Sequence, residues 1–202
     1  MNDVYVKFYD VPEFNRREIL RYAGVREATD EMLSLMEECI GIARGKSAFK
    51  ICYAEFPVAS EDDKIDVGFA KVNSAALKKA LSGCHKVVVF AATVGVEMDR
   101  LVAKYSAISP SKGLMLQAIG AERIECLCDM FCADLRALAD ERGETIRPRF
   151  SPGYGDLPLE LQREVFSALD CPRKIGLTLN DSLLMSPTKS VTAIVGISSN
   201  GA

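Results

Sequence analysis

"RPRFSPGYGDLPLE", residues 147–160, places an arginine just before a turn that contains two glycines and a tyrosine. Arg149 is a permanent cation whose planar guanidinium suits a carboxylate or a phosphate. Gly153 and Gly155 have no Cβ, so a ligand can approach their backbone closely. Tyr154 adds a flat apolar ring and a hydroxyl group. This stretch predicts either a structural turn or a binding site for a ligand that has a carboxylate and a flat heterocycle.

The composition of the whole chain is that of a globular protein. The chain has 202 residues, of which 49% are hydrophobic, so we expect a single domain over residues 1–202 with a sizeable core. The formal net charge is -3 and the pI is about 5.4. This balance argues against nucleic-acid binding by phosphate neutralisation, whereas an acidic small molecule held by one or two arginines stays possible.

Targeting signals are not apparent in the sequence. Residues 1–17 lack the apolar core of a signal peptide, and the longest clean apolar run, at 87–92, is far shorter than a membrane span. Seven cysteines without a secretory signal indicate reduced thiols. We therefore expect a cytoplasmic protein with no membrane partner.

Hydrophobic periodicity and turn residues predict an α+β fold. Strands are predicted over residues 4–9, 49–58, 65–72, 86–95 and 190–198. Helices are predicted over residues 30–44, 74–82, 97–105, 112–142, 157–169 and 172–180. Thr29 and Asp156 are expected to cap two of these helices. Because helices and strands do not alternate regularly, we predict a mixed or antiparallel twisted sheet packed with helices rather than a doubly wound α/β fold.

The long helix is expected to bury one apolar stripe, formed by Ile124, Leu127, Cys128, Phe131, Leu135 and Leu138. Glu122 and Glu125 on the same helix indicate a solvated charged face or, alternatively, a contact to a cationic ligand. In "CLCDMFC" (126–132), Cys126 points about 160° or more away from Cys128. Three thiols on one helix cannot converge on a metal from that geometry, so we expect small buried residues and no metal.

Common catalytic signatures are missing. His85 is the single histidine, which excludes a histidine-rich metal site within one chain and disfavours a histidine-based triad. We expect His85 to be structural or solvated. The sequence has no G-x-G-x-x-G fingerprint after a strand and no Walker A loop.

A resemblance to a known family gives the 147–160 stretch more weight. "RFSPGYGDLP" (149–158), a helix, and then "LTLNDSLLMSPTKSVTAIVGIS" (177–198) resemble the S-adenosylmethionine-binding activation domain of cobalamin-dependent methionine synthase. That family carries an Arg-x-x-x-Gly-Tyr signature, which Arg149 to Tyr154 match. The resemblance covers the second half of the chain well and the first half in outline.

The resemblance implies a function for the whole chain. It implies binding of S-adenosylmethionine and reductive methylation of an oxidised Co(II) corrinoid on a cobalamin-dependent methionine synthase or related methyltransferase. The partner would carry the cobalamin, and a low-potential electron-transfer protein would supply one electron. The reacting atoms then belong to the cofactors, so no catalytic residue is expected in this chain. The homocysteine, folate and cobalamin modules do not fit into 202 residues, so we expect action in trans.

The resemblance also implies the contacts. By position, S-adenosylmethionine would contact Arg149, Ser151, Pro152, Gly153, Tyr154 and Gly155, with Arg149 at the polar end of the ligand. Backbone groups at 151–154 would bond the rest, in a shallow groove walled by the long helix and residues 185–188. The family's further site tyrosine has no counterpart here, and its acidic contact from the N-terminal part is not placed; Asp10 is one candidate.

Two other interpretations remain open. The chain could be a non-catalytic module of the same fold that senses S-adenosylmethionine or a corrinoid protein. It could instead be an unrelated metabolic or metal-thiol protein in which Arg149 is structural. Binding of S-adenosylmethionine excludes the second of these, and methylation of a corrinoid partner excludes the first.

Overall fold

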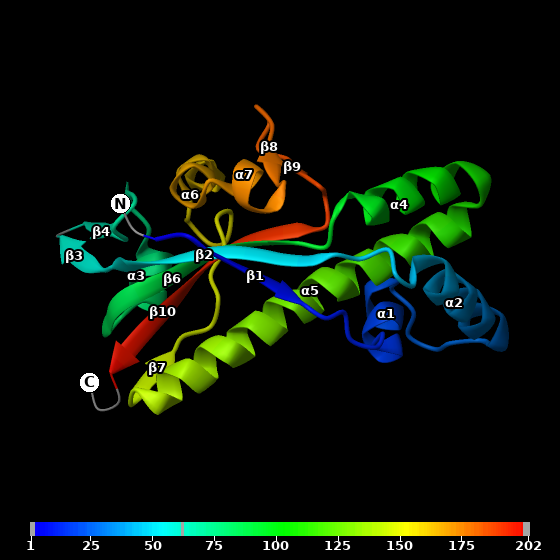
Figure 1. Cartoon of the computed structure of the whole chain (residues 1–202), viewed down its shortest axis with the longest axis horizontal. Coiled ribbons are helices and arrows are strands. Elements are labelled where there is room, and N and C mark those ends of the chain that lie inside the picture. The colour runs from blue at the N-terminus through cyan, green and yellow to red at the C-terminus, as the bar shows by residue number, and fades with distance from the viewer. Residues whose placement is uncertain (1–2, 62, 200–202) are drawn as a thin grey trace.

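A five-stranded antiparallel sheet forms the centre of the computed structural model, which describes residues 3–61 and 63–199 (Figure 1). In spatial order its strands are β1 (Tyr5–Tyr9), β2 (Phe49–Pro57), β6 (Cys84–Thr93), β10 (Ser190–Ser199) and β7 (Glu144–Ile146). Strand β6 is central and its run from Val87 to Thr93 is buried. The predicted α+β class is confirmed, and the sheet is the antiparallel alternative.

One face of the sheet packs against α5 (Pro110–Glu141), which runs diagonally beneath it in Figure 1. Three further helices gather around the N-terminal part of α5: α1 (Arg16–Tyr22), α2 (Asp30–Ala43) and α4 (Val96–Ile108). Phe131 of α5 stacks edge-on with Phe90 of β6 at 4.9 Å. The apolar stripe of α5 thus positions this helix, which later forms one wall of the candidate site.

The other face is covered by shorter elements. Above the sheet in Figure 1 lie α6 (Gln162–Leu169) and α7 (Cys171–Ile175), while α3 (Ala75–Ala80) packs near the far end. A single 3-10 turn, η1 (Leu159–Leu161), precedes α6. Two small sheets complete the fold, one of β3 (Ala59–Glu61), β4 (Lys64–Asp66) and β5 (Lys71–Val72) and one of β8 (Thr178–Leu179) and β9 (Met185–Ser186). No helix in the described part of the chain is long and apolar enough to cross a membrane.

Two predicted elements are wrong. The strand predicted over 65–72 is a hairpin of β4 and β5, and the residues before it contain a further short strand, β3. Gly68 turns the chain with a φ of +80°, and the Asp66 carboxylate accepts a hydrogen bond of 2.8 Å from the Gly68 N–H. The helix predicted over 172–180 ends at Ile175, because Gly176 adopts a left-handed conformation with φ of +73°.

Helix α1 and strands β7, β8 and β9 were not predicted. Helix α1 has seven residues, too few for a clear apolar period. A local signal was present, since the Asn15 side chain accepts a hydrogen bond of 3.2 Å from the Glu18 N–H as an N-cap. The strands have two or three residues, which is too short for alternation to be read.

Asp156 and Leu138 also differ from expectation. Asp156 does not cap the helix after it; its carboxylate instead accepts hydrogen bonds from the Ser74 hydroxyl and from the N–H groups of Ala75 and Ala76. It thereby ties the 147–160 stretch to the start of α3.

Leu138 is 47% exposed, while the other residues of the predicted α5 stripe are buried.

Candidate functional site

The stretch after β7 returns to the main sheet through Phe150. The N–H and C=O groups of Phe150 each hydrogen-bond to Ile194 of β10 at 2.8 Å. Phe150 packs with the core under α6 and α7, so its neighbour Arg149 extends the other way, toward α5. This local alternation places the guanidinium between the sheet and the long helix.

Arg149 is held by two carboxylates of α5. Its Nη2 lies 2.5 Å from Glu125 Oε2 and its Nη1 lies 2.9 Å from Asp129 Oδ1. Glu125 and Asp129 are four residues apart, so both lie on one face of the helix. The Arg149 side chain is 27% exposed. From the sequence we expected a cation that is available to a ligand. In the structure, a ligand carboxylate must share the Arg149 guanidinium with Glu125 and Asp129.

The glycine turn is closed by its own hydrogen bonds. The Gly153 N–H donates to Leu157 O at 2.9 Å, and the Tyr154 N–H donates to Ser151 O at 3.1 Å. These two N–H groups are therefore not available to a ligand, although the resemblance implied contacts from backbone groups at 151–154. Gly153 and Gly155 have φ of +90° and +57°. Their glycine identity follows from this left-handed backbone rather than from a visible ligand approach.

Gly153→Val is expected to lower the free energy of unfolding by about 1–3 kcal/mol, because a β-branched residue is strained at positive φ. A Cβ at this position would also lie 3.3 Å from Leu159 Cδ1. Urea denaturation measures the change. Gly41→Val is the matched control, because Gly41 is an exposed helical position with open space around its Cα. Equal stability of the two variants would contradict a strained turn.

A small hollow of about 270 Å³ opens beside this turn. It is lined by Glu125, Arg149, Ser151, Pro152, Tyr154, Gln162, Met185, Ser190, Val191 and Thr192. Four of the six predicted contact residues line it, and the two glycines do not. Tyr154 is 62% exposed at its mouth and contacts Phe150 edge-on.

The two expected walls supply only part of the lining of the small hollow, because α6 contributes Gln162 and β10 contributes Ser190, Val191 and Thr192. Glu125 belongs to the long helix, and Met185 belongs to the predicted 185–188 wall. Thr188, at the end of that predicted wall, is not part of the lining, and its N–H and its hydroxyl both donate to the Asp99 carboxylate at 2.7 Å. The segment between β9 and β10 is thus held to the start of α4.

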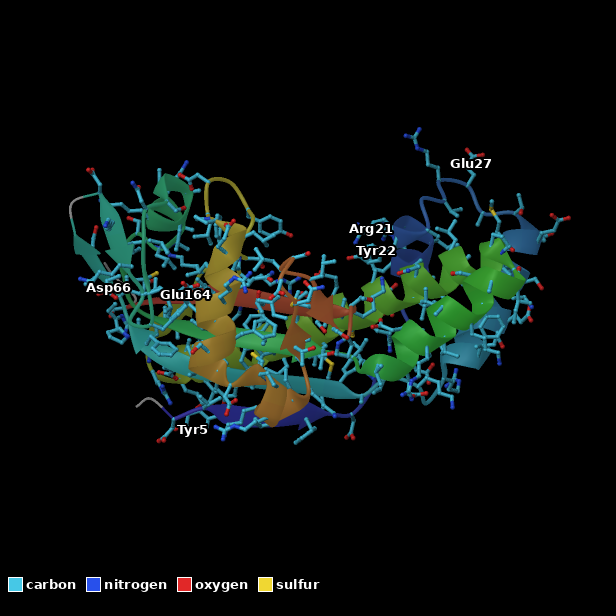
Figure 2. All side chains as sticks on the ribbon, turned by 90° about the horizontal axis from the view of Figure 1, so that it is seen from above. Tyr5, Arg21, Tyr22, Glu27, Asp66 and Glu164 are labelled. Carbon is cyan, nitrogen blue, oxygen red and sulfur yellow. The ribbon has the colours of Figure 1, made fainter. Side chains whose placement is uncertain are left out.

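A larger hollow of about 650 Å³ adjoins the small one. The two share Arg149 and Glu125, so this ion pair forms their common wall. The larger hollow is lined by Pro12, Glu13, Asn15, Glu18, Arg21, Tyr22, Glu122, Glu125, Cys126, Asp129, Met130 and Arg149. Figure 2 shows Arg21 and Tyr22 on α1, beside the long helix. Five carboxylates and two guanidiniums face this space, which therefore favours a ligand with positive charge.

Sequence reasoning missed the α1 side of the site. Asp10, the candidate N-terminal acid, is exposed and does not line either hollow. The acids that do line the larger hollow from the N-terminal part are Glu13 and Glu18. The Asn15 cap was a local signal for α1, but the packing of this segment on the long helix comes from contacts to Glu122 and Arg123 more than 100 residues away.

A buried ion pair fixes this side of the site. Glu122 is 3% exposed, so its interpretation as part of a solvated face is wrong. Arg123 Nε donates to Glu122 Oε2 at 2.5 Å, and its Nη1 and Nη2 donate to the carbonyls of Pro12 and Glu13 at 2.6 and 3.0 Å. Glu122 in turn accepts from the Asn15 N–H at 3.2 Å. The pair therefore anchors the segment between β1 and α1 on α5.

The three thiols of residues 126–132 diverge as the helical period predicts. Cys126 lines the larger hollow, whereas Cys128 is buried in the core. Burial raises the pKa of the Cys128 and Cys132 thiols, which favours the protonated form and disfavours metal binding. Within residues 3–61 and 63–199, no group of three His, Cys, Asp or Glu side chains is arranged to hold a metal. His85 is exposed, with its Nε2 3.1 Å from Glu144.

Comparison with known proteins shows the family to which the chain belongs. The sequence model of the vitamin B12-dependent methionine synthase activation domain matches residues 73–201. The chain belongs to this family. The match includes α5, the 147–160 stretch and β10, which carry the small hollow. No curated protein sequence matches the chain.

The fold of the activation domain is also seen in a solved structure. The crystal structure of the MetH reactivation domain bound to AdoHcy aligns with a TM-score of 0.70 and 15% sequence identity. The alignment covers 99% of this chain and 79% of that chain. The likeness therefore extends to β1, α1 and α2, which lie outside the residues matched by the family model.

Proposed function

We propose that this activation domain binds S-adenosylmethionine across the two adjoining hollows. The observation that carries the proposal is the Arg149–Glu125 pair, which both hollows share. The ligand has a carboxylate for the guanidinium, and an ammonium and a sulfonium for the surrounding acids. Its aromatic base suits the exposed ring of Tyr154. The MetH reactivation domain, whose fold is similar, was solved with AdoHcy, the demethylated form of this ligand.

The sizes of the hollows support occupation of both. Pockets for drug-sized ligands measure about 300–1,000 Å³. The hollow beside Tyr154, at about 270 Å³, is below that range, and the hollow beside α1, at about 650 Å³, lies within it. An extended nucleoside attached to an amino acid would place one end in each hollow.

We propose further that the bound ligand methylates a Co(II) corrinoid carried by a cobalamin-dependent methionine synthase or related methyltransferase, in trans. One electron from a low-potential electron-transfer protein reduces Co(II) to Co(I). The Co(I) electron pair then attacks the sulfonium methyl carbon, the carbon–sulfur bond breaks, and S-adenosylhomocysteine leaves. This chain supplies binding and orientation. The exposed position of Tyr154 at the mouth of the small hollow leaves that end accessible to a partner.

A mixing experiment tests the proposed reaction. A Co(II) corrinoid protein, a low-potential electron donor and S-adenosylmethionine are combined with and without this chain, and the corrin absorbance reports methyl-Co(III). We expect faster formation when the chain is present. Calorimetric binding of S-adenosylmethionine without any acceleration would favour the sensing module instead. Absence of binding would refute S-adenosylmethionine as the ligand, while the membership of the chain in the family would stand.

Arg149→Ala is expected to weaken S-adenosylmethionine binding about tenfold. A charge-assisted hydrogen bond contributes about 1.5–3 kcal/mol, and we expect the lower end because Glu125 and Asp129 already share the guanidinium. Calorimetric titration measures the dissociation constant. Arg100→Ala is the control, because Arg100 is an exposed arginine of α4. An unchanged dissociation constant in folded Arg149→Ala would refute this role.

A further inference from the structure

One buried polar atom at the small hollow has no hydrogen-bond partner in the described part of the chain. Gln162, the first residue of α6, lines the hollow and is only 6% exposed. Its Oε1 is shielded from solvent and lacks a hydrogen-bond donor among the described residues. An unsatisfied buried polar atom costs about 1–3 kcal/mol, so such atoms are rare in folded proteins.

The neighbouring hydroxyl of Ser190 does not satisfy this amide. Ser190 Oγ lies 2.8 Å from both Pro187 O and Thr93 Oγ1, and these contacts occupy its single proton and one of its lone pairs. Ser190 and Gln162 nevertheless line the same hollow, together with Thr192. One wall of the hollow is therefore polar and buried.

Part of the remaining lining, which also includes Glu125, Arg149 and Ser151, suits a flat apolar ring. Tyr154 offers an exposed aromatic face, and Pro152, Met185 and Val191 supply apolar surface. A methionine thioether also packs favourably against aromatic rings. A volume of about 270 Å³ accepts one heterocycle rather than a complete nucleoside joined to an amino acid.

We infer that Gln162 is a specificity-determining residue that recognises the amino edge of an adenine ring in the small hollow. This inference rests on the proposed binding of S-adenosylmethionine. A primary amide presents an acceptor beside a donor, and adenine presents its exocyclic amino donor beside a ring-nitrogen acceptor. Glutamine pairs with adenine through two hydrogen bonds in this manner in protein–DNA complexes.

This role of Gln162 determines which end of the ligand lies in which hollow. With adenine held by Gln162 and covered by Tyr154, the amino-acid end passes Arg149 and reaches the acidic larger hollow. Glu13, on the segment held by the buried Arg123 pair, and Glu18 of α1 lie there. The base and the ammonium group are then recognised by different halves of the fold.

The test compares two ligands by calorimetric titration of the whole chain. One is S-adenosylhomocysteine and the other is its analogue with hydrogen in place of the 6-amino group. We expect wild-type protein to bind the amino form about tenfold more tightly, because the analogue leaves the buried amide oxygen unpaired. Gln162→Met is expected to bind both ligands equally weakly, while the control Gln117→Met, at an exposed position of α5, keeps the wild-type preference.

Thermal unfolding gives a second readout. Gln162→Met is expected to melt at the same or a higher temperature than wild type without ligand, since it removes a buried amide oxygen that has no donor. If wild type binds both ligands equally, the inference is wrong and the proposed function stands. If wild type binds neither ligand, both are wrong. The comparison of the two ligands on wild-type protein tests the inference even if Gln162→Met does not fold.

Discussion

Arg123→Ala is expected to lower the free energy of unfolding by about 3–5 kcal/mol, the range for breaking a buried ion pair by removing one partner. The change leaves Glu122 as a buried charge without its cation. It also removes the donors to the carbonyls of Pro12 and Glu13, which connect β1 to α1. Urea denaturation followed by circular dichroism measures the loss.

Two further variants separate this effect from a general loss of charge on α5. Arg136→Ala is the matched control, because Arg136 is exposed on the same helix, and its effect should stay within about 0.5 kcal/mol. Replacement of both partners, Glu122→Leu with Arg123→Met, should cost less than Arg123→Ala alone, because no buried charge is left uncompensated. A loss below about 1 kcal/mol for Arg123→Ala would show that the pair does not anchor the N-terminal segment.

The parts of the fold that the sequence predicts well have local signals. The valine run of β6 and the apolar stripe of α5 repeat over many residues, and Thr29 caps α2 as expected, with its hydroxyl accepting from the Met32 N–H at 3.3 Å. Gly45, which follows that helix, has a left-handed φ of +71°. Periodicity and caps depend on neighbours within a few residues, which is why they can be read without the tertiary structure.

The electrostatics of the site depend on distant residues and could not be predicted in the same way. Arg149 pairs with acids that are 24 and 20 residues away, on another element. Glu122 and Arg123 look like surface charges because they are adjacent and of opposite sign. The packing of the 12–15 segment on α5 helps to bury them, and this packing cannot be read from local sequence. Sequence reasoning therefore found the turn and its arginine, but not the second hollow.

The ring of Tyr154 is expected to hold the ligand in the orientation that methyl transfer requires. Tyr154→Ala is expected to slow methyl transfer to a Co(II) corrinoid protein on the order of a hundredfold, the cost of misplacing the reacting atoms by about 1 Å. The ring is exposed at the mouth of the small hollow and rests edge-on against Phe150. Without it, a base in that hollow would lose the surface that holds it in one orientation.

The measurement uses the corrin absorbance at saturating S-adenosylmethionine, so that weaker binding does not mimic slower transfer. Tyr154→Phe is the control, because it keeps the ring and removes only the hydroxyl, and it should react at nearly the wild-type rate. If Tyr154→Ala at saturation is as fast as wild type, the ring does not orient the ligand. If Tyr154→Phe is as slow as Tyr154→Ala, the hydroxyl group is the functional part, and the role of the ring as a covering surface must be given up.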